Sequence, residues 1–206
     1  MTNAIDVHII VRASTMDAQE IAMRTQELIR TSRGTEVPAA GDWRIPRSHV
    51  TVTYTARTGL GRRVQARAPS ASGVVRLTDD LADATLELII DAAATSVPSN
   101  APSLGSLLGN EDLRHVVLRA GGIELMPDGR WSMRGEIRIG RSTVPAPVVV
   151  TYHGVFRFGD DAKARISVRS DIRRPDVTAR RPVTLVADVL AVCPRQAARS
   201  SATCAD

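Results

Sequence analysis

The chain has 206 residues, of which 43% are apolar and 24% charged. These values are typical of a globular protein with one main domain. The sequence lacks an apolar run as long as a membrane span, and it lacks the amino-terminal pattern of a cleaved secretion signal. We therefore expect a cytoplasmic protein with no membrane span.

Only 3% of the residues are aromatic, so the core must be built mainly from Val, Ile, Leu and Ala. Such a core is either thin or partly hollow. The formal net charge is +5, and Lys163 is the only lysine beside many arginines. An anionic partner and an ordinary solvated surface both explain this excess of positive charge. We expect no binding to nucleic acid, because the arginines are not interleaved with exposed aromatic residues.

Residues 1–42 differ in pattern from the rest of the chain. Apolar residues such as Ile21 and Leu28 recur at helical spacing and predict an amphipathic helix over about residues 16–32. The Pro- and Gly-containing segment Thr35–Gly41 indicates a linker. The helix would pack on the main domain or join two copies in a homodimer.

From Trp43 onward the apolar residues alternate with polar ones, which is typical of antiparallel strands with one dry face. The clearest strands are Thr85–Ala92, Arg130–Gly140 and Val148–Phe158. Long neighbouring strands without intervening helices favour a closed barrel, because closure removes exposed edges. The Ser-, Pro- and Gly-rich segment Ser96–Asn110 is then either an open loop or a lid over one mouth.

Five motifs along these strands resemble the YceI-like family of lipocalin-like barrels, some of which bind polyisoprenoids. They are Trp43–Val50, Val64–Gly73, Leu88–Ala93, the Trp131–Gly140 strand with Thr143 and Pro145, and Ile172–Val177. The resemblance covers residues 43–192 and leaves 193–206 as a tail. It implies an all-β, antiparallel, lipocalin-like barrel of about eight strands. The amphipathic helix predicted over about residues 16–32 would precede this barrel.

The chain departs from the family pattern where large side chains are usual. Two family Phe positions hold Ala68 and Ala71, a third holds Val177, and the segment from Ser96 to Arg114 is rewritten. Replacing a buried Phe by Ala leaves an unfilled volume, at a cost of roughly 3–5 kcal/mol. We expect this space to be filled by a ligand, by the N-terminal helix or by the rewritten loop.

The inward stripe of the strands is the candidate ligand-binding site, although a plain packed core would give the same stripe. An isoprenoid also carries a polar head, for which Arg173 and Arg174 at a strand end are candidate contacts. The predicted inward residues are Val52, Tyr54, Ala66, Ala68, Leu88, Ile90, Met133, Ile137, Val150, Tyr152, Ile166 and Val168.

No motif nominates a catalytic residue, a cofactor or a metal. The four histidines, including His49 and His153, lie at no metal-ligand spacing and are expected on the surface. Cys193 and Cys204 match no metal motif and are expected to be free thiols. We therefore predict a non-enzymatic protein that carries or stores an isoprenoid, quinone-like or fatty chain. The alternative is a ligand-free interaction or structural module.

Overall fold

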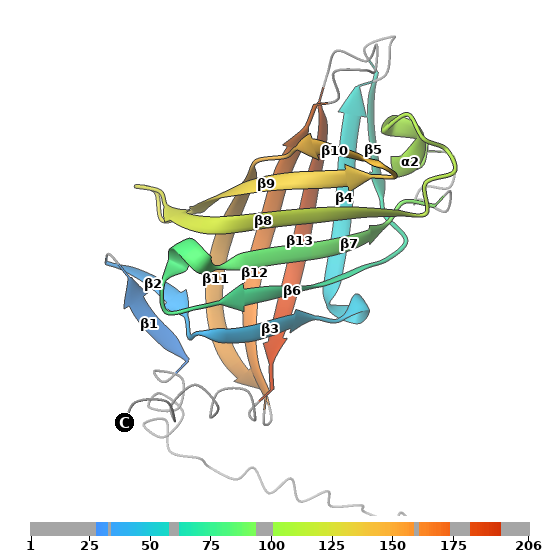
Figure 1. The fold of residues 1–206 in the computed structure, drawn as a ribbon. Helices are drawn as coiled ribbons and strands as arrows, with labels where there is room; N and C mark the ends of the chain where they lie inside the picture. Colours follow the sequence, from blue (N-terminus) through green and yellow to red (C-terminus); the bar gives the residue numbers. More distant parts are fainter. Residues whose placement is uncertain are drawn as a thin grey trace, which may run out of the picture.

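The computed structural model describes residues 28–32, 34–57, 62–93, 101–158, 161–173 and 182–194. In this part of the chain the strands wrap around a common interior (Figure 1). The strands are β1 (Ile29–Ser32), β2 (Thr35–Pro38), β3 (Gly41–Ile45), β4 (Val50–Arg57), β5 (Arg63–Arg67), β6 (Ala71–Leu77), β7 (Thr85–Asp91), β8 (His115–Leu125), β9 (Trp131–Ile139), β10 (Ser142–Pro145), β11 (Val148–Phe158), β12 (Asp161–Ile172) and β13 (Val183–Cys193). Three short helices join them: η1 (Arg47–His49), η2 (Leu81–Asp83) and α2 (Leu104–Leu107).

The main sheet closes on itself as a barrel. Its strands follow the order β12-β11-β9-β8-β7-β6-β3-β13, and the additional pairing of β12 with β13 completes the ring of eight. β4 continues β3 after η1, since both pair with β13, and β5 pairs with β4 as β6 pairs with β3. All the pairings are antiparallel, so the predicted barrel of about eight strands is confirmed.

The three strands predicted most clearly lie where expected, as β7, β9 and β11. Their residues alternate between buried and more exposed, as do those of β12 and β13. Because successive side chains of a strand point to opposite faces, one face of each strand lines the interior. Alanine is frequent on that face, at Ala66, Ala71, Ala164, Ala187 and Ala191.

Two glycines allow neighbouring backbones to approach closely. A Cβ atom at Gly73 on β6 would lie 2.0 Å from the carbonyl oxygen of Glu87, and one at Gly135 on β9 would lie 2.4 Å from that of Ala146. No other residue type fits at such a distance. Both glycines belong to the motifs that resemble the YceI-like family.

The segment before Trp43 differs from the prediction. Residues 29–32 form strand β1 and residues 35–38 form β2, so the predicted helix does not extend to residue 32 and Thr35–Gly41 is not a linker. The two strands pair as a hairpin, in which Ile29 faces Pro38. Backbone pairing outweighs the helical spacing here, because the hairpin buries Leu28 and Val37 against the barrel. Residues 16–27 of the predicted helix lie outside the described residues.

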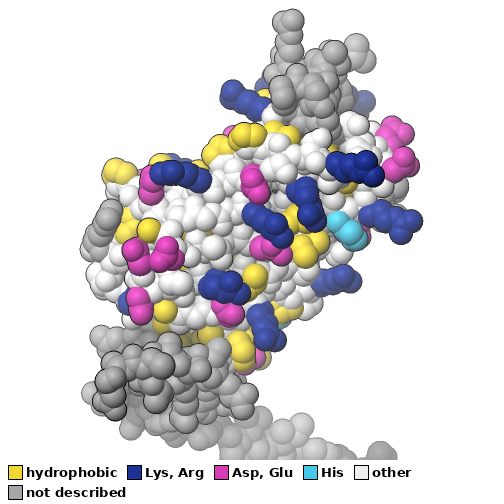
Figure 2. Space-filling view, in the orientation of Figure 1, with side chains coloured by type: hydrophobic (Ala, Val, Ile, Leu, Met, Phe, Trp, Pro, Cys, Tyr) yellow, Lys and Arg dark blue, Asp and Glu magenta, His cyan; other side chains and the backbone are white. Residues whose placement is uncertain are grey.

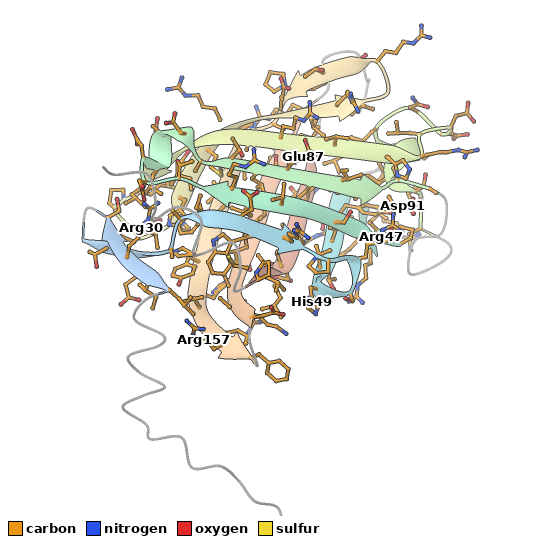
Figure 3. The ribbon with its side chains drawn as sticks, turned by 60° about the horizontal axis from the view of Figure 1, so that its bottom comes forward. Arg30, Arg47, His49, Glu87, Asp91 and Arg157 are labelled. Atoms are coloured by element: carbon orange, nitrogen blue, oxygen red, sulfur yellow. The ribbon has the colours of Figure 1, made fainter. Side chains whose placement is uncertain are left out.

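The hairpin and the α2 segment lie at opposite ends of the strands. In Figure 3, Arg30 marks the hairpin and Asp91 marks the end of β7 beside the α2 segment. Arg30 ties the hairpin to the turn after β6, donating to the carbonyl oxygens of Thr78 and Asp79. The barrel is therefore covered by a different part of the chain at each end.

Candidate ligand-binding interior

The predicted inward residues line the interior of the barrel. Eleven of the twelve are buried, and the twelfth, Tyr152, is half-buried and packs against the core. The register brings several of them side by side, such as Val150 opposite Val168 on β12 and Tyr54 opposite Ala66 on β5. The inward direction assigned to these residues from the sequence therefore agrees with their burial, while their contact with a ligand stays a prediction.

Three polar atoms in this interior have no hydrogen-bond partner among the described residues. They are the indole Nε1 of Trp131, the phenol oxygen of Tyr152 and the hydroxyl oxygen of Ser170. Trp131 and Ser170 are each 2% exposed, and the ring of Trp131 stacks on that of Tyr152 with centroids 5.5 Å apart. A buried polar group without a partner costs about 1–3 kcal/mol, so each of these atoms favours a bound group that hydrogen-bonds to it.

The environment of Tyr152 also changes its acidity. Burial, followed by the negative charge of Glu36 on β2, raises the pKa of Tyr152 to about 12. The phenol therefore stays protonated at neutral pH and keeps a hydrogen to donate. Its partner inside the barrel would be an acceptor such as a carbonyl or ether oxygen.

The α2 segment covers one mouth of the barrel. Ser103 caps the helix by accepting from the backbone N–H of Ser106, and the side chains of Leu104 and Leu108 are each 1% exposed. The hydroxyl of Tyr54 donates to the carbonyl oxygen of Pro102 at 2.9 Å, which ties the segment to β4. Of the two alternatives for Ser96–Asn110, the described residues 101–110 form the lid.

The lid and the hairpin also supply side chains to the core. Leu104, Leu108 and Leu113 enter from the lid end, and Leu28 and Val37 enter from the hairpin end. All five side chains belong to the same core cluster. Of the two internal sources of filling named from the sequence, the rewritten loop contributes side chains to the core. Residues 16–27 of the N-terminal helix and Val177 lie outside the described residues.

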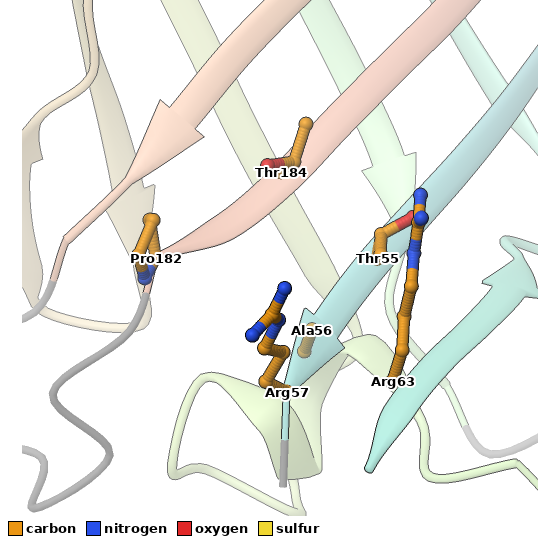
Figure 4. Close-up of a pocket in the computed structure, with 6 residues that line it drawn as sticks. All are labelled: Thr55, Ala56, Arg57, Arg63, Pro182 and Thr184. Atoms are coloured by element: carbon orange, nitrogen blue, oxygen red, sulfur yellow. The ribbon is translucent and has the colours of Figure 1, made fainter. Parts of the chain in front are cut away.

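The predicted head-group arginines are only partly described. Arg173 is exposed just after β12, whereas Arg174 lies outside the described residues. Beside this strand end, a cleft of about 250 Å³ is lined by Thr55, Ala56, Arg57, Arg63, Pro182 and Thr184 (Figure 4). The structure thus points to Arg57 and Arg63 as further cationic groups at this rim.

Elsewhere on the barrel several arginines are matched with carboxylates. Across β3 and β6, Arg76 contacts Asp42 at 2.9 Å, and across β7 and β8, Arg119 contacts Glu87 at 2.7 Å. Figure 2 shows basic and acidic side chains interspersed over this face. Exposed pairs of this kind contribute little stability, so here the arginines form an ordinary solvated surface.

Three residue types of a hydrolase triad meet on the outer face of the barrel, but in the wrong order. The hydroxyl of Ser167 donates to Asp188 at 2.9 Å, and Nε2 of His153 lies 2.9 Å from the same hydroxyl. A triad needs the histidine between the carboxylate and the hydroxyl, so that it can take the proton. Here the serine is in the middle, and the cluster is a cross-strand polar ladder on β11, β12 and β13.

A second outer hollow lies where η1 interrupts the strand formed by β3 and β4. It has a volume of about 430 Å³ and is bordered by Ser48, His49, Val50, Thr51, Phe156, Arg165, Asp188, Val189 and Leu190. His49 lies in η1 rather than on a strand, and its Nδ1 is buried without a partner among the described residues. His153, in contrast, is exposed on β11 as predicted.

The described residues contain no group of three or more His, Cys, Asp or Glu side chains that could hold a metal ion. Cys193 is a free, buried cysteine, and burial followed by the charges of Asp42 and Asp161 raises the pKa of its thiol. Among the helices of the described part, none is long and apolar enough to cross a membrane.

Several residues of this site are not among the site residues that the sequence predicts. Trp131 and Ser170 fall in phase with the predicted inward residues of their own strands, so their alternation already carried the signal. Arg57 ends β4 and Arg63 begins β5, so the bounds of these paired strands place them at a hairpin end. Leu104 and Leu108 had no such signal, because their segment has no strand or helix periodicity.

Comparisons with known proteins add little to this picture. No family model and no curated protein matches the sequence. Among solved structures, the crystal structure of Burkholderia cenocepacia BcnA aligns with a TM-score of 0.41 and 13% sequence identity, covering 72% of this chain and 99% of that chain. The barrel fold is established by the strand pairing itself, and it is compatible with the binding of a small ligand.

Proposed function

We propose that this protein binds a long apolar ligand inside the barrel, without catalysing a reaction, as a divergent relative of the YceI-like lipocalin barrels. The ligand would be an isoprenoid, quinone-like or fatty chain. The observation that carries the proposal is the set of unpaired polar atoms of Trp131, Tyr152 and Ser170 in an otherwise apolar interior. A ligand with an apolar chain and an oxygen atom would satisfy both parts of that interior.

The inner wall supports the same proposal by its shape. Alanine is frequent on it, and an eight-stranded barrel is just wide enough for side chains or for one small ligand. The ligand would enter by displacement of the lid, which a hydrogen bond from Tyr54 ties to β4. Among the described residues, the side chains that line the interior offer no nucleophile beside a base, which favours binding over catalysis.

The direct experiment is organic extraction of the purified protein followed by mass spectrometry. The extracted protein is then titrated with farnesol and with dodecanoic acid, and the fluorescence of the two buried tryptophans is followed. We expect a co-purified lipid and saturable binding of at least one probe. Trp131→Phe should weaken binding, whereas Ser132→Ala on the outer side of β9 should leave it unchanged.

The filled barrel ends favour the alternative function, a ligand-free interaction or structural module. Leu104 and Leu108 at one end and Leu28 and Val37 at the other take up interior space. If extraction yields no lipid and neither probe binds, the module without a ligand is the better description. Light scattering on the full chain and on a chain that begins at residue 28 would then test a role in self-association.

A further inference from the structure

The rim cleft between β4, β5 and the start of β13 contains an unusual pair of residues. Arg57, the last residue of β4, is the register partner of Arg63, the first residue of β5. Among all the strand pairs of the described residues, these two are the only like charges that face each other. Like charges directly opposite one another destabilise a strand pair.

In the other facing pairs of charged residues on the barrel, opposite charges meet. Asp42 faces Arg76, and Arg119 faces Glu87 on one side and Glu136 on the other. Among the described residues, no acidic side chain lines the cleft beside Arg57 and Arg63, and no ion pair joins either arginine to one of them. Both side chains are exposed and therefore free to turn toward a bound anion.

The cleft also provides hydroxyl groups. Thr55 lies beside the guanidinium group of Arg63 (Figure 4), and its hydroxyl is available to donate. Thr184 already donates to Asp171 at 2.6 Å, and that carboxylate lies 3.7 Å from Arg169 on its own strand. The carboxylate of Asp171 is therefore already paired with Thr184 and Arg169.

We propose that this cleft binds a phosphate group, held by the guanidinium groups of Arg57 and Arg63 and by the hydroxyl of Thr55. Guanidinium groups bind phosphate oxygens through paired, charge-assisted hydrogen bonds, and a doubly charged anion removes the repulsion between the two arginines. The site lies on the outer rim and does not depend on a ligand inside the barrel. Its phosphate would come from a soluble phosphate compound or from the head group of an anionic lipid.

The test uses the full chain and a matched control. Binding of inorganic phosphate and of pyrophosphate is measured by calorimetry, at an ionic strength held constant with chloride. The variant is Arg57→Gln with Arg63→Gln. The control is Arg44→Gln with Arg134→Gln, on β3 and β9, which removes the same charge away from the cleft. We expect saturable binding that the cleft variant weakens about tenfold or more and that the control leaves unchanged.

A second arm separates the two sources of phosphate. Vesicles of phosphatidylcholine with phosphatidic acid are compared with vesicles of phosphatidylcholine alone, in a sedimentation assay. Vesicle binding that depends on Arg57 and Arg63, without binding of the soluble anions, identifies a lipid head group as the source. If neither soluble phosphates nor vesicles bind, or if both variants lose binding equally, the cleft is not a phosphate site. Thermal unfolding of both variants in chloride shows that each is folded.

Discussion

The hydroxyl group of Ser170 allows a test of ligand binding. Its removal should change the free energy of unfolding in opposite directions without and with a bound ligand. Ser170 is 2% exposed on β12, and its hydroxyl oxygen has no partner among the described residues. Ser170→Ala removes that oxygen and little volume. In the ligand-free protein, removal of an unpaired buried hydroxyl should raise the free energy of unfolding by about 1–2 kcal/mol. Most core substitutions lower it.

With ligand bound, the same substitution removes a hydrogen bond instead. The gain in the free energy of unfolding should then shrink or reverse. The affinity for a probe that reaches Ser170 should fall by roughly fivefold to tenfold, since a hydrogen bond contributes about 1 kcal/mol. Urea unfolding of extracted protein, followed by tryptophan fluorescence, measures the first effect. The same curve with saturating farnesol measures the second.

The control is Ser132→Ala, on the outward side of β9, which should change the unfolding free energy by no more than about 0.5 kcal/mol. The slope of the free energy against urea should be the same in all three proteins, so that the midpoints report stability. If Ser170→Ala destabilises the extracted protein by about 1 kcal/mol or more, the hydroxyl is already paired, and Ser170 no longer supports a bound ligand.

Three further predictions follow from the packing and the titration of the barrel. Leu108→Ala should lower the free energy of unfolding by about 2–5 kcal/mol, because this lid side chain is 1% exposed. A loss under about 1 kcal/mol in urea unfolding would mean that the lid does not close the mouth. Gly73→Ala should destabilise the protein strongly or prevent folding, since its Cβ would lie 2.0 Å from a backbone oxygen of β7. Gly121→Ala is the control, because the nearest atom to its Cβ would be 3.8 Å away, and it should cost little in thermal unfolding. Equal effects of the two substitutions would refute the close approach. The pKa of Tyr152 is raised from 10.0 to about 12, so the folded state keeps this proton while the unfolded state loses it, and the free energy of unfolding should fall as pH rises between these two values. The loss should stay below about 2–3 kcal/mol, because solvent screens part of the effect at a half-buried group. Tyr152→Phe should abolish it in urea unfolding at a series of pH values, and an unchanged slope would contradict the assignment.

The alternation of residues was enough to predict the barrel and the direction of its side chains. A strand with one buried face must repeat with period two, so the sequence alone assigns Val150 and Ile166 to the interior. The same reasoning failed for residues 29–38. Leu28 and Ile29 fit a helical spacing, but the barrel surface that buries Leu28 is distant in the sequence, and it favours a hairpin.

The sequence by itself determined most strands of the barrel and their inward residues, because both depend on neighbours along the chain. The tertiary structure decided what closes the barrel and which polar atoms are left without partners. Leu104 reaches the core only because the lid folds over the mouth, and the oxygen of Ser170 is unpaired only because apolar strands surround it. The opposition of Arg57 and Arg63 likewise depends on the register of two strands, which a shift of one residue would remove.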